Sequence, residues 1–191
     1  MTNIAIVEDV KTIREGLKTL LESSQELNCT GVYKSFENFS KCLSECSPDV
    51  ILLDIDLPGI FGVEGIKKLK TLSEDFIIIV LTVYEENDKV FDALRVGANS
   101  YLVKNTPAAK MIKLIEDAVN GSVIMNSFIA RKVLALFKKN RLQHTIDKTD
   151  KQILNILIEG NNLPALGAEL NLTVSEIKKR FNSIYKILHS L

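Results

Sequence analysis

The chain has 191 residues with 24 acidic and 24 basic side chains, so its formal net charge at pH 7 is zero. Its longest apolar run, Phe76 to Leu81, is too short to cross a bilayer, and no signal pattern opens the sequence. These features exclude a membrane-spanning protein and predict a cytoplasmic one. The three cysteines are an odd number, which argues against a disulfide framework.

The charges are unevenly distributed along the chain. Residues 1–120 hold 13 Lys and Arg against 19 Asp and Glu, whereas residues 121–191 hold 11 against 5. The length allows a domain of about 120 residues followed by a small one. An acidic domain followed by a basic one predicts a nucleic-acid partner for the second. A small solvated domain that is basic by chance is the plainer alternative.

Short apolar runs alternate with amphipathic helical patterns up to about residue 120. The runs are typical of buried strands in a parallel sheet, and a glycine at position 97 is typical of a helix end. The pattern predicts an α/β fold with a doubly wound, five-stranded parallel sheet in domain 1–120. The expected strands are 4–7, 29–33, 50–53, 76–81 and 101–103, and the expected helices are 10–21, 35–46, 62–72, 86–96 and 111–119.

The remaining chain has a helical pattern only. Residues 121–147 are predicted to form a linker with an amphipathic helix, and residues 148–191 a small all-α domain. Its second and third helices, joined by a short turn at Asn171, form a helix-turn-helix candidate. Thr173 and Glu176 have the spacing of a capping box at the start of the third helix. The side chains of that helix expected in the core are Val174, Ile177, Phe181, Ile184 and Leu188.

Polar side chains follow four of the predicted strands. Glu8 and Asp9 come after the first strand, Asp54 after the third, Thr82 after the fourth and Lys104 after the fifth. Functional groups in an open parallel sheet collect at the carboxyl ends of the strands. We therefore expect these side chains to meet at one edge of the sheet.

Carboxylates in such a group are suited to phosphoryl chemistry. Asp54 can attack phosphorus as a nucleophile, but its approach to a phosphoryl donor brings negative charges together. A magnesium ion relieves this repulsion, and its oxygen ligands are predicted to be the carboxylates of Glu8, Asp9 and Asp54, the backbone carbonyl of Asp56, and water.

The other two residues have separate tasks in this scheme. Lys104 adds a positive charge, and the Thr82 hydroxyl donates to a phosphoryl oxygen. Taken alone, Thr82 is a residue that favours strands and Lys104 a solvated surface charge. Together with the carboxylates, in this order at strand ends, they favour the functional interpretation.

One known family has the same residues in the same order: Glu8-Asp9, Asp54 with Leu57-Pro58-Gly59 and Gly62, Thr82, Gly97-Ala98-Asn99-Ser100-Tyr101, and Lys104 with Asn105-Thr106-Pro107. Residues 1–120 resemble the receiver domain of a bacterial two-component response regulator. The resemblance implies that a sensor histidine kinase phosphorylates Asp54, that Thr82 follows the phosphoryl group, and that Tyr101 reorients as a switch. Val83 stands where the family usually has a small residue, which would slow transfer or restrict the donors.

The carboxyl-terminal part is similar to the LuxR-type helix-turn-helix of the NarL/FixJ class. The resemblance spans about residues 146–188, including Ile153-Leu154, Gly160, Leu166, Ile177-Lys178 and Ile184-Tyr185-Lys186. A helical wheel of the third helix turns one set of polar side chains outward, where they would enter a major groove. The predicted DNA-binding residues are Ser175, Lys179, Asn182 and Lys186, with Lys178 at the flank.

Three departures from this second pattern affect the prediction. Glu176 stands where the family typically has Thr. Gly167 stands where it usually has Ala, and a glycine in a helix interior lowers helix stability by up to about 1 kcal/mol. The sequence ends at Leu191, before the fourth helix that helps to pair two such domains in the family.

The sequence therefore predicts a response regulator that couples phosphorylation to DNA binding and transcription, with a sensor kinase, DNA and a second copy of itself as partners. A regulator whose degenerate helix-turn-helix contacts a protein instead is an alternative. Asp54-Ile55-Asp56 also resembles the acidic pair of haloacid-dehalogenase-like phosphohydrolases. That pair follows the first strand in those enzymes and the third strand here. We therefore expect no enzymatic activity other than self-phosphorylation from a phosphodonor and self-dephosphorylation.

Overall fold

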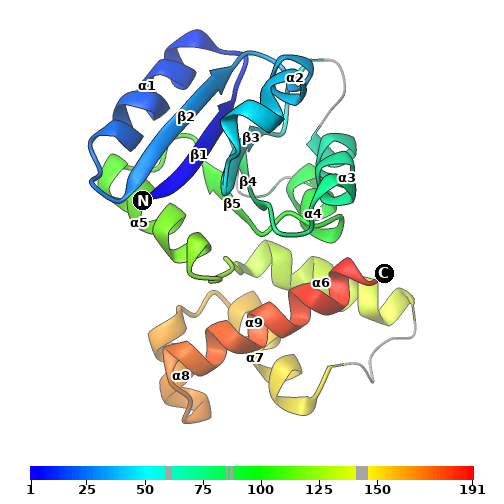
Figure 1. Cartoon of the computed structure of the whole chain (residues 1–191). Coiled ribbons are helices and arrows are strands. Elements are labelled where there is room, and N and C mark those ends of the chain that lie inside the picture. Colours follow the sequence, from blue (N-terminus) through cyan, green and yellow to red (C-terminus); the bar gives the residue numbers. More distant parts are fainter. Residues whose placement is uncertain (59–61, 85, 87, 141–145) are drawn as a thin grey trace. The chain divides into compact units, whose positions relative to one another are not determined.

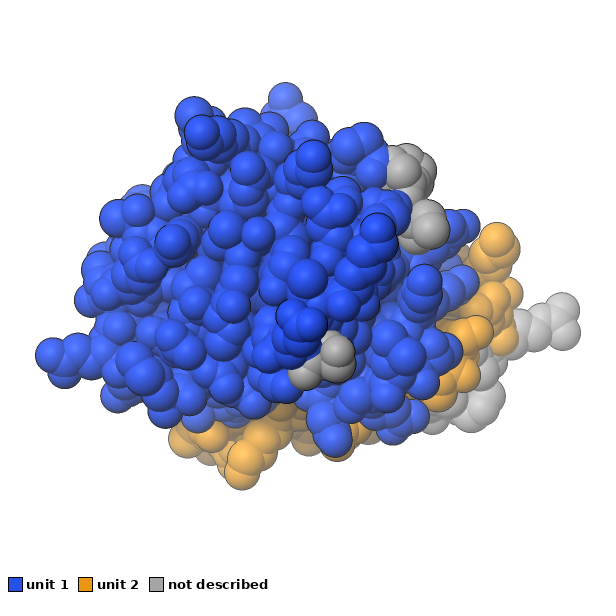
Figure 2. Space-filling model, turned by 45° about the horizontal axis from the view of Figure 1, so that its top comes forward, with its two compact units in different colours: residues 1–121 blue, residues 122–191 orange. Residues whose placement is uncertain are grey.

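The chain divides into two compact units, Met1–Gly121 and Ser122–Leu191, coloured separately in Figure 2. The computed structural model describes all residues except 59–61, 85, 87 and 141–145, so Gly59 of the receiver motif lies outside the described residues. The division assigns the amphipathic helix expected in the linker to the second unit. Within the described residues, every helix is too short or too polar to traverse a lipid bilayer.

Five parallel strands in the order β2-β1-β3-β4-β5 form the sheet of the first unit, which confirms the predicted doubly wound α/β fold. The apolar runs explain this arrangement, because every side chain of β3 and nearly every one of β4 is buried between two layers of helices. The strands are β1 (Thr2–Val7), β2 (Leu27–Tyr33), β3 (Val50–Asp54), β4 (Ile77–Thr82) and β5 (Ser100–Val103).

Helices cover both faces of this sheet, with α1 and α5 on one face and α2, α3 and α4 on the other (Figure 1). Each βα loop therefore opens at the same edge of the sheet, where the strands end. Gly97 follows α4 with a φ of 115°, the left-handed conformation that glycine adopts easily after a helix. The helices are α1 (Lys11–Glu22), α2 (Phe36–Cys46), α3 (Gly62–Leu72), α4 (Asp88–Arg95) and α5 (Ala108–Val119).

The described part of the second unit consists of helices around a small apolar core. Thr173 and Glu176 form the predicted capping box, since each side chain accepts a hydrogen bond from the other's backbone N–H. Asp147 and Asp150 form a second one, and Arg180 donates to both carboxylates at 2.8 Å. The helices are α6 (Ser127–Lys139), α7 (Lys148–Ile158), α8 (Leu163–Leu170) and α9 (Val174–His189).

Two positions of the second unit differ from the sequence expectation. Val174 is 40% exposed rather than buried, because it is the first residue of α9 and the buried face begins one turn later at Ile177. Gly167 has a structural role besides its low helix propensity. A Cβ at this position would lie 2.6 Å from the Leu172 carbonyl oxygen, which is too close for a side chain. The Leu172 N–H donates to the Gly167 carbonyl at 2.9 Å, so the glycine allows the turn between α8 and α9 to close tightly.

Candidate functional site

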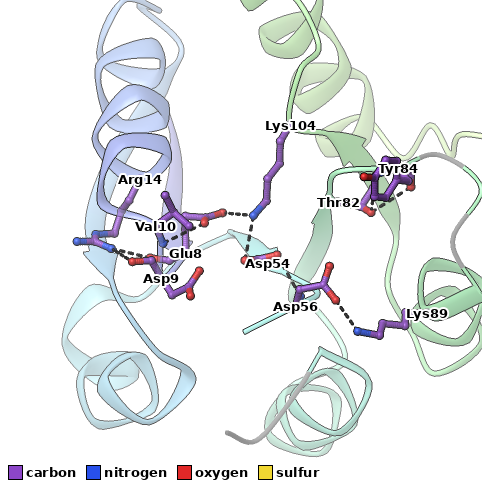
Figure 3. A network of polar contacts seen from close by, with 10 residues as sticks. All are labelled: Glu8, Asp9, Val10, Arg14, Asp54, Asp56, Thr82, Tyr84, Lys89 and Lys104. Atoms are coloured by element: carbon purple, nitrogen blue, oxygen red, sulfur yellow. Dashed lines mark hydrogen bonds and ion pairs between the residues drawn. The ribbon is translucent and has the colours of Figure 1, made fainter. Parts of the chain in front are cut away.

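Three carboxylates meet where β1 and β3 end, as the strand pattern predicted. The two strands are hydrogen-bonded neighbours with Val7 opposite Leu53, so the residues that follow them lie close together. One oxygen from each of Glu8, Asp9 and Asp54 lies within 4.8 Å of the others (Figure 3). Glu8 and Asp54 are buried and Asp9 is exposed, so the cluster opens to solvent on one side.

Lys104 lies directly after β5 and reaches into this cluster. Its Nζ is 2.7 Å from Glu8 Oε2 and 2.9 Å from Asp54 Oδ2, so one ammonium group bridges the two buried carboxylates (Figure 3). The Lys104 backbone N–H donates to the Thr82 carbonyl oxygen at 2.7 Å, which fixes where the side chain starts. With only 11% of its side chain exposed, Lys104 is part of the site and not a solvated surface charge.

Burial and charge pairing act together on the titration of this site. Burial raises the pKa of Glu8 above its ordinary value, and the hydrogen bond with Lys104 offsets only part of that rise. Burial by itself would lower the pKa of Lys104, but its hydrogen bonds with Glu8 and Asp54 outweigh this, so the pKa of Lys104 is raised. Lys104 therefore keeps its positive charge at neutral pH.

Thr82, at the end of β4, is completely buried, but its hydroxyl engages its own loop. The hydroxyl donates to the Tyr84 carbonyl oxygen at 3.1 Å and accepts from the Tyr84 N–H at 3.3 Å (Figure 3). Tyr101, the predicted switch residue on β5, is 3% exposed. Both side chains are thus buried, and the Thr82 hydroxyl is held by the Tyr84 backbone.

Asp56 is coupled to Asp54 and to α4. Its N–H donates to Asp54 Oδ1 at 3.1 Å, and its carboxylate forms an ion pair with Lys89 of α4 (Figure 3). Arg14 of α1 donates to the carbonyl oxygens of Glu8 and Asp9 at 2.7 and 3.0 Å. Lys89 and Arg14 were not predicted from the sequence, because a lone basic residue on an amphipathic helix carries no signal that separates it from surface charges.

The three carboxylates fit a hard divalent cation. Their oxygens converge, two of the three groups are buried, and Mg²⁺ prefers such anionic oxygen ligands. Buried carboxylates are unfavourable without a compensating positive charge, which Lys104 supplies in part. The acidic cluster of Glu8, Asp9 and Asp54 is therefore consistent with a metal site.

The predicted DNA-binding residues of α9 fall into two groups. Ser175, Lys179 and Lys186 are exposed, as the helical wheel predicted. Lys178 and Asn182 are half-buried, and Lys178 Nζ donates to Ser122 Oγ at 3.4 Å. The connector (residues 122–126), which precedes α6, therefore contacts the flank of α9 that carries Lys178.

Comparison with known proteins extends over both units. Residues 4–116 match the family described as response regulator receiver domain. The transcriptional regulatory protein LiaR of Bacillus subtilis is 31% identical over 188 residues, which are 96% of this chain and 89% of LiaR. The nitrate/nitrite response regulator protein NarL of Escherichia coli is 24% identical, covering 96% of this chain and 87% of NarL.

Solved structures show the same fold. The RcsB response regulator of Salmonella typhimurium is similar with a TM-score of 0.60 at 18% identity, covering all of this chain and 92% of that chain.

Receiver-domain response regulators are not catalytic enzymes, which agrees with the sequence prediction and leaves no support for the phosphohydrolase alternative. With a family match over more than half of its length and relatives along nearly all of it, this chain belongs to the receiver-domain response regulators of the NarL class.

Proposed function

We propose that Asp54 is the phosphoacceptor of this response regulator and that a sensor histidine kinase supplies the phosphoryl group in the cytoplasm. The observation that carries the proposal is the ammonium group of Lys104, which lies within 3 Å of both Asp54 and Glu8 at the edge where the strands end. A cation placed there stabilises the negative charge that a phosphoryl group brings to Asp54.

In the transfer, a carboxylate oxygen of Asp54 forms a bond to phosphorus while the bond from phosphorus to the donor breaks. Bound magnesium, held by Glu8, Asp9, Asp54 and the carbonyl of Asp56, would neutralise charge between the carboxylates and the phosphoryl oxygens. Lys104 keeps its charge throughout and donates to a phosphoryl oxygen. It remains beside Glu8, whose carboxylate it already contacts.

Thr82 has to change partners for the signal to leave the site. Its hydroxyl bonds the Tyr84 carbonyl and would turn to donate to the phosphoryl group, which releases the Tyr84 backbone. Tyr101, buried on the neighbouring strand, is the residue that we propose to respond to this release. The result is a local charge change at Asp54 that is passed on through Thr82 and Tyr101.

For the output, we propose that residues 148–191 bind DNA as a helix-turn-helix, with residues 121–147 as the joining segment and a second copy of the chain as partner. The exposed side chains of Ser175, Lys179 and Lys186 lie on one face of α9, where they can reach bases and phosphates. Residues 121–191 are basic, and LiaR is named a transcriptional regulatory protein, which supports this output.

Phosphorylation is tested by labelling the full-length chain from radioactive acetyl phosphate with Mg²⁺. Asp54→Asn should abolish a base-labile label, whereas Asp75→Asn, the same substitution at an exposed position, should leave it unchanged. Undiminished labelling of Asp54→Asn would place the phosphoacceptor elsewhere. EDTA should remove labelling of the unmodified chain, because the carboxylates then repel the donor.

DNA binding is tested by fluorescence anisotropy with fragments from upstream of the protein's own gene, across a salt series and with or without beryllofluoride. Affinity that falls steeply with salt and drops in Lys179→Ala and Lys186→Ala supports DNA readout. Lys148→Ala, at an exposed lysine on α7, is the matched control. Salt-insensitive binding to a protein partner, without DNA binding, would instead support the protein-contacting output.

A further inference from the structure

Two hydrogen bonds join the connector (residues 122–126) to α9. Tyr185 is 2% exposed, and its hydroxyl donates to the carbonyl oxygen of Ile124 at 2.5 Å. Two residues earlier in the connector, Ser122 Oγ accepts the 3.4 Å hydrogen bond from Lys178. A stretch of chain without regular secondary structure is thus held along a helix by a buried hydroxyl and an ammonium group.

The covered flank of α9 includes two of the predicted DNA contacts. Residues 178, 182 and 185 are spaced by four and three positions, so they lie along one side of the helix. Lys178 and Asn182 are half-buried there, whereas Lys179 and Lys186, on the adjoining side, are exposed. The half-buried Lys178 and Asn182 thus lie on the side of α9 that carries Lys178 and Tyr185, the two residues bonded to the connector.

We propose that the connector is a latch on α9, which withholds Lys178 and Asn182 from DNA while Tyr185 holds the carbonyl of Ile124. The proposal rests on the DNA-binding function proposed above and adds a regulatory step to it. With the latch closed, only the exposed part of the predicted contact face reaches a duplex. Release of the connector adds a phosphate-binding ammonium group and an amide that can bond a base edge.

Chain continuity connects this latch to the receiver. Helix α5 ends at Val119, and only Asn120 and Gly121 separate it from the connector. Gly121 has a φ of 77°, the left-handed conformation that glycine adopts easily after a helix, and its N–H donates to the Ala118 carbonyl oxygen of α5 at 2.9 Å. Because the segment between them is two residues long, a displacement at the end of α5 is passed directly to Ser122.

Tyr185→Phe tests the latch, because it removes the hydroxyl and retains the ring in the core. Without beryllofluoride, DNA affinity should rise about 2- to 10-fold, the range that one neutral hydrogen bond provides. With beryllofluoride, the variant and the unmodified chain should bind equally, since the latch is then open in both. Ser183→Ala, which removes an exposed hydroxyl from the same helix, is the matched control and should change neither affinity.

A second measurement reads the latch without DNA. The rate at which an amine-reactive reagent modifies Lys178, followed by peptide mass spectrometry, should rise in Tyr185→Phe, while that of the exposed Lys179 should stay constant. An unchanged rate at Lys178 would overturn the latch even if DNA binding is intact. Faster modification of Lys178 with no DNA binding in any state would instead refute the DNA-binding function and leave the closed connector established.

Discussion

Replacing Lys104 by methionine tests whether its ammonium group is what makes two buried carboxylates tolerable. Glu8 and Asp54 are 0% and 2% exposed, and Lys104 contacts them at 2.7 and 2.9 Å. Removing one partner of a buried ion pair typically costs about 3–5 kcal/mol. Because the site opens to solvent beside Asp9, we expect the lower end, about 3 kcal/mol of unfolding free energy, at pH 7.5 without divalent cations.

The matched control is Lys89→Met, which breaks an ion pair with Asp56 whose side chains are 61% and 45% exposed. An exposed pair contributes at most about 1 kcal/mol, so this variant should be nearly as stable as the unmodified chain. Hydrogen exchange of the β1 and β3 amides is the assay, because it follows the first unit alone in a two-unit chain. Equal losses in the two variants would refute the role assigned to Lys104.

The pH dependence of Lys104→Met gives a second check. The pKa of Glu8 is raised in the folded chain, so the ionised carboxylate lowers the stability of the fold at pH values above that pKa. This loss of stability disappears as the pH falls toward the ordinary pKa of a glutamate, because Glu8 then becomes protonated. Loss of Lys104 removes a contact that lowers the pKa of Glu8 and therefore enlarges the effect. Between pH 7.5 and 5, the variant should recover stability relative to the unmodified chain; a constant difference would contradict this.

Three further predictions concern other parts of the chain. Gly167→Ala should destabilise α8 and α9, as seen by faster hydrogen exchange, because the new Cβ meets the Leu172 carbonyl at 2.6 Å; helix propensity alone predicts a gain of about 1 kcal/mol. Arg180→Ala should speed hydrogen exchange in the second unit at neutral pH, and the difference from the unmodified chain should shrink in acid. The hydrogen bonds of Asp147 with Arg180 and the Asp150 backbone N–H lower its pKa, so its contribution is present above the ordinary value of 3.8 and is lost as the pH falls through the lowered pKa. Val83→Ala should speed labelling from acetyl phosphate several-fold, since this half-exposed side chain directly follows Thr82, and an unchanged rate would exclude steric restriction by it.

The acidic cluster was predictable because strand order and strand ends are set by patterns that a sequence displays directly. Apolar runs such as Val50 to Leu53 predict buried strands, and the parallel fold then brings the residues after them to one edge. No side-chain geometry was needed for that step. Glu8, Asp54 and Lys104 therefore converge as expected, although the direction of the Thr82 hydroxyl depends on a loop that periodicity does not describe.

The surroundings of α9 were less predictable for a related reason. A helical wheel separates the buried Ile177 from the exposed Lys179 because helices pack against helices with a 3.6-residue period. The connector has no such period, so its contact with Lys178 leaves no pattern in the sequence. For Gly167 the sequence pattern was misleading. Helix propensity predicts only that a glycine weakens α8, whereas the structure shows that the Leu172 carbonyl occupies the space that a Cβ would need.

Thr82 and Lys178 share one property that bears on the proposed signalling. Each is a predicted functional group that is already hydrogen-bonded within the chain, Thr82 to the Tyr84 backbone and Lys178 to Ser122. The Thr82 bond joins two neutral groups and contributes about 1 kcal/mol, whereas a bond to a charged phosphate contributes about 1.5–3 kcal/mol. A phosphoryl group on Asp54 can therefore outcompete the Tyr84 backbone. Lys178 bonds a neutral hydroxyl at 3.4 Å, whereas a DNA phosphate offers its ammonium group an opposite charge. For Thr82 the exchange shifts the equilibrium by only a factor of about 2 to 30, which is enough for a reversible switch and too little to lock it.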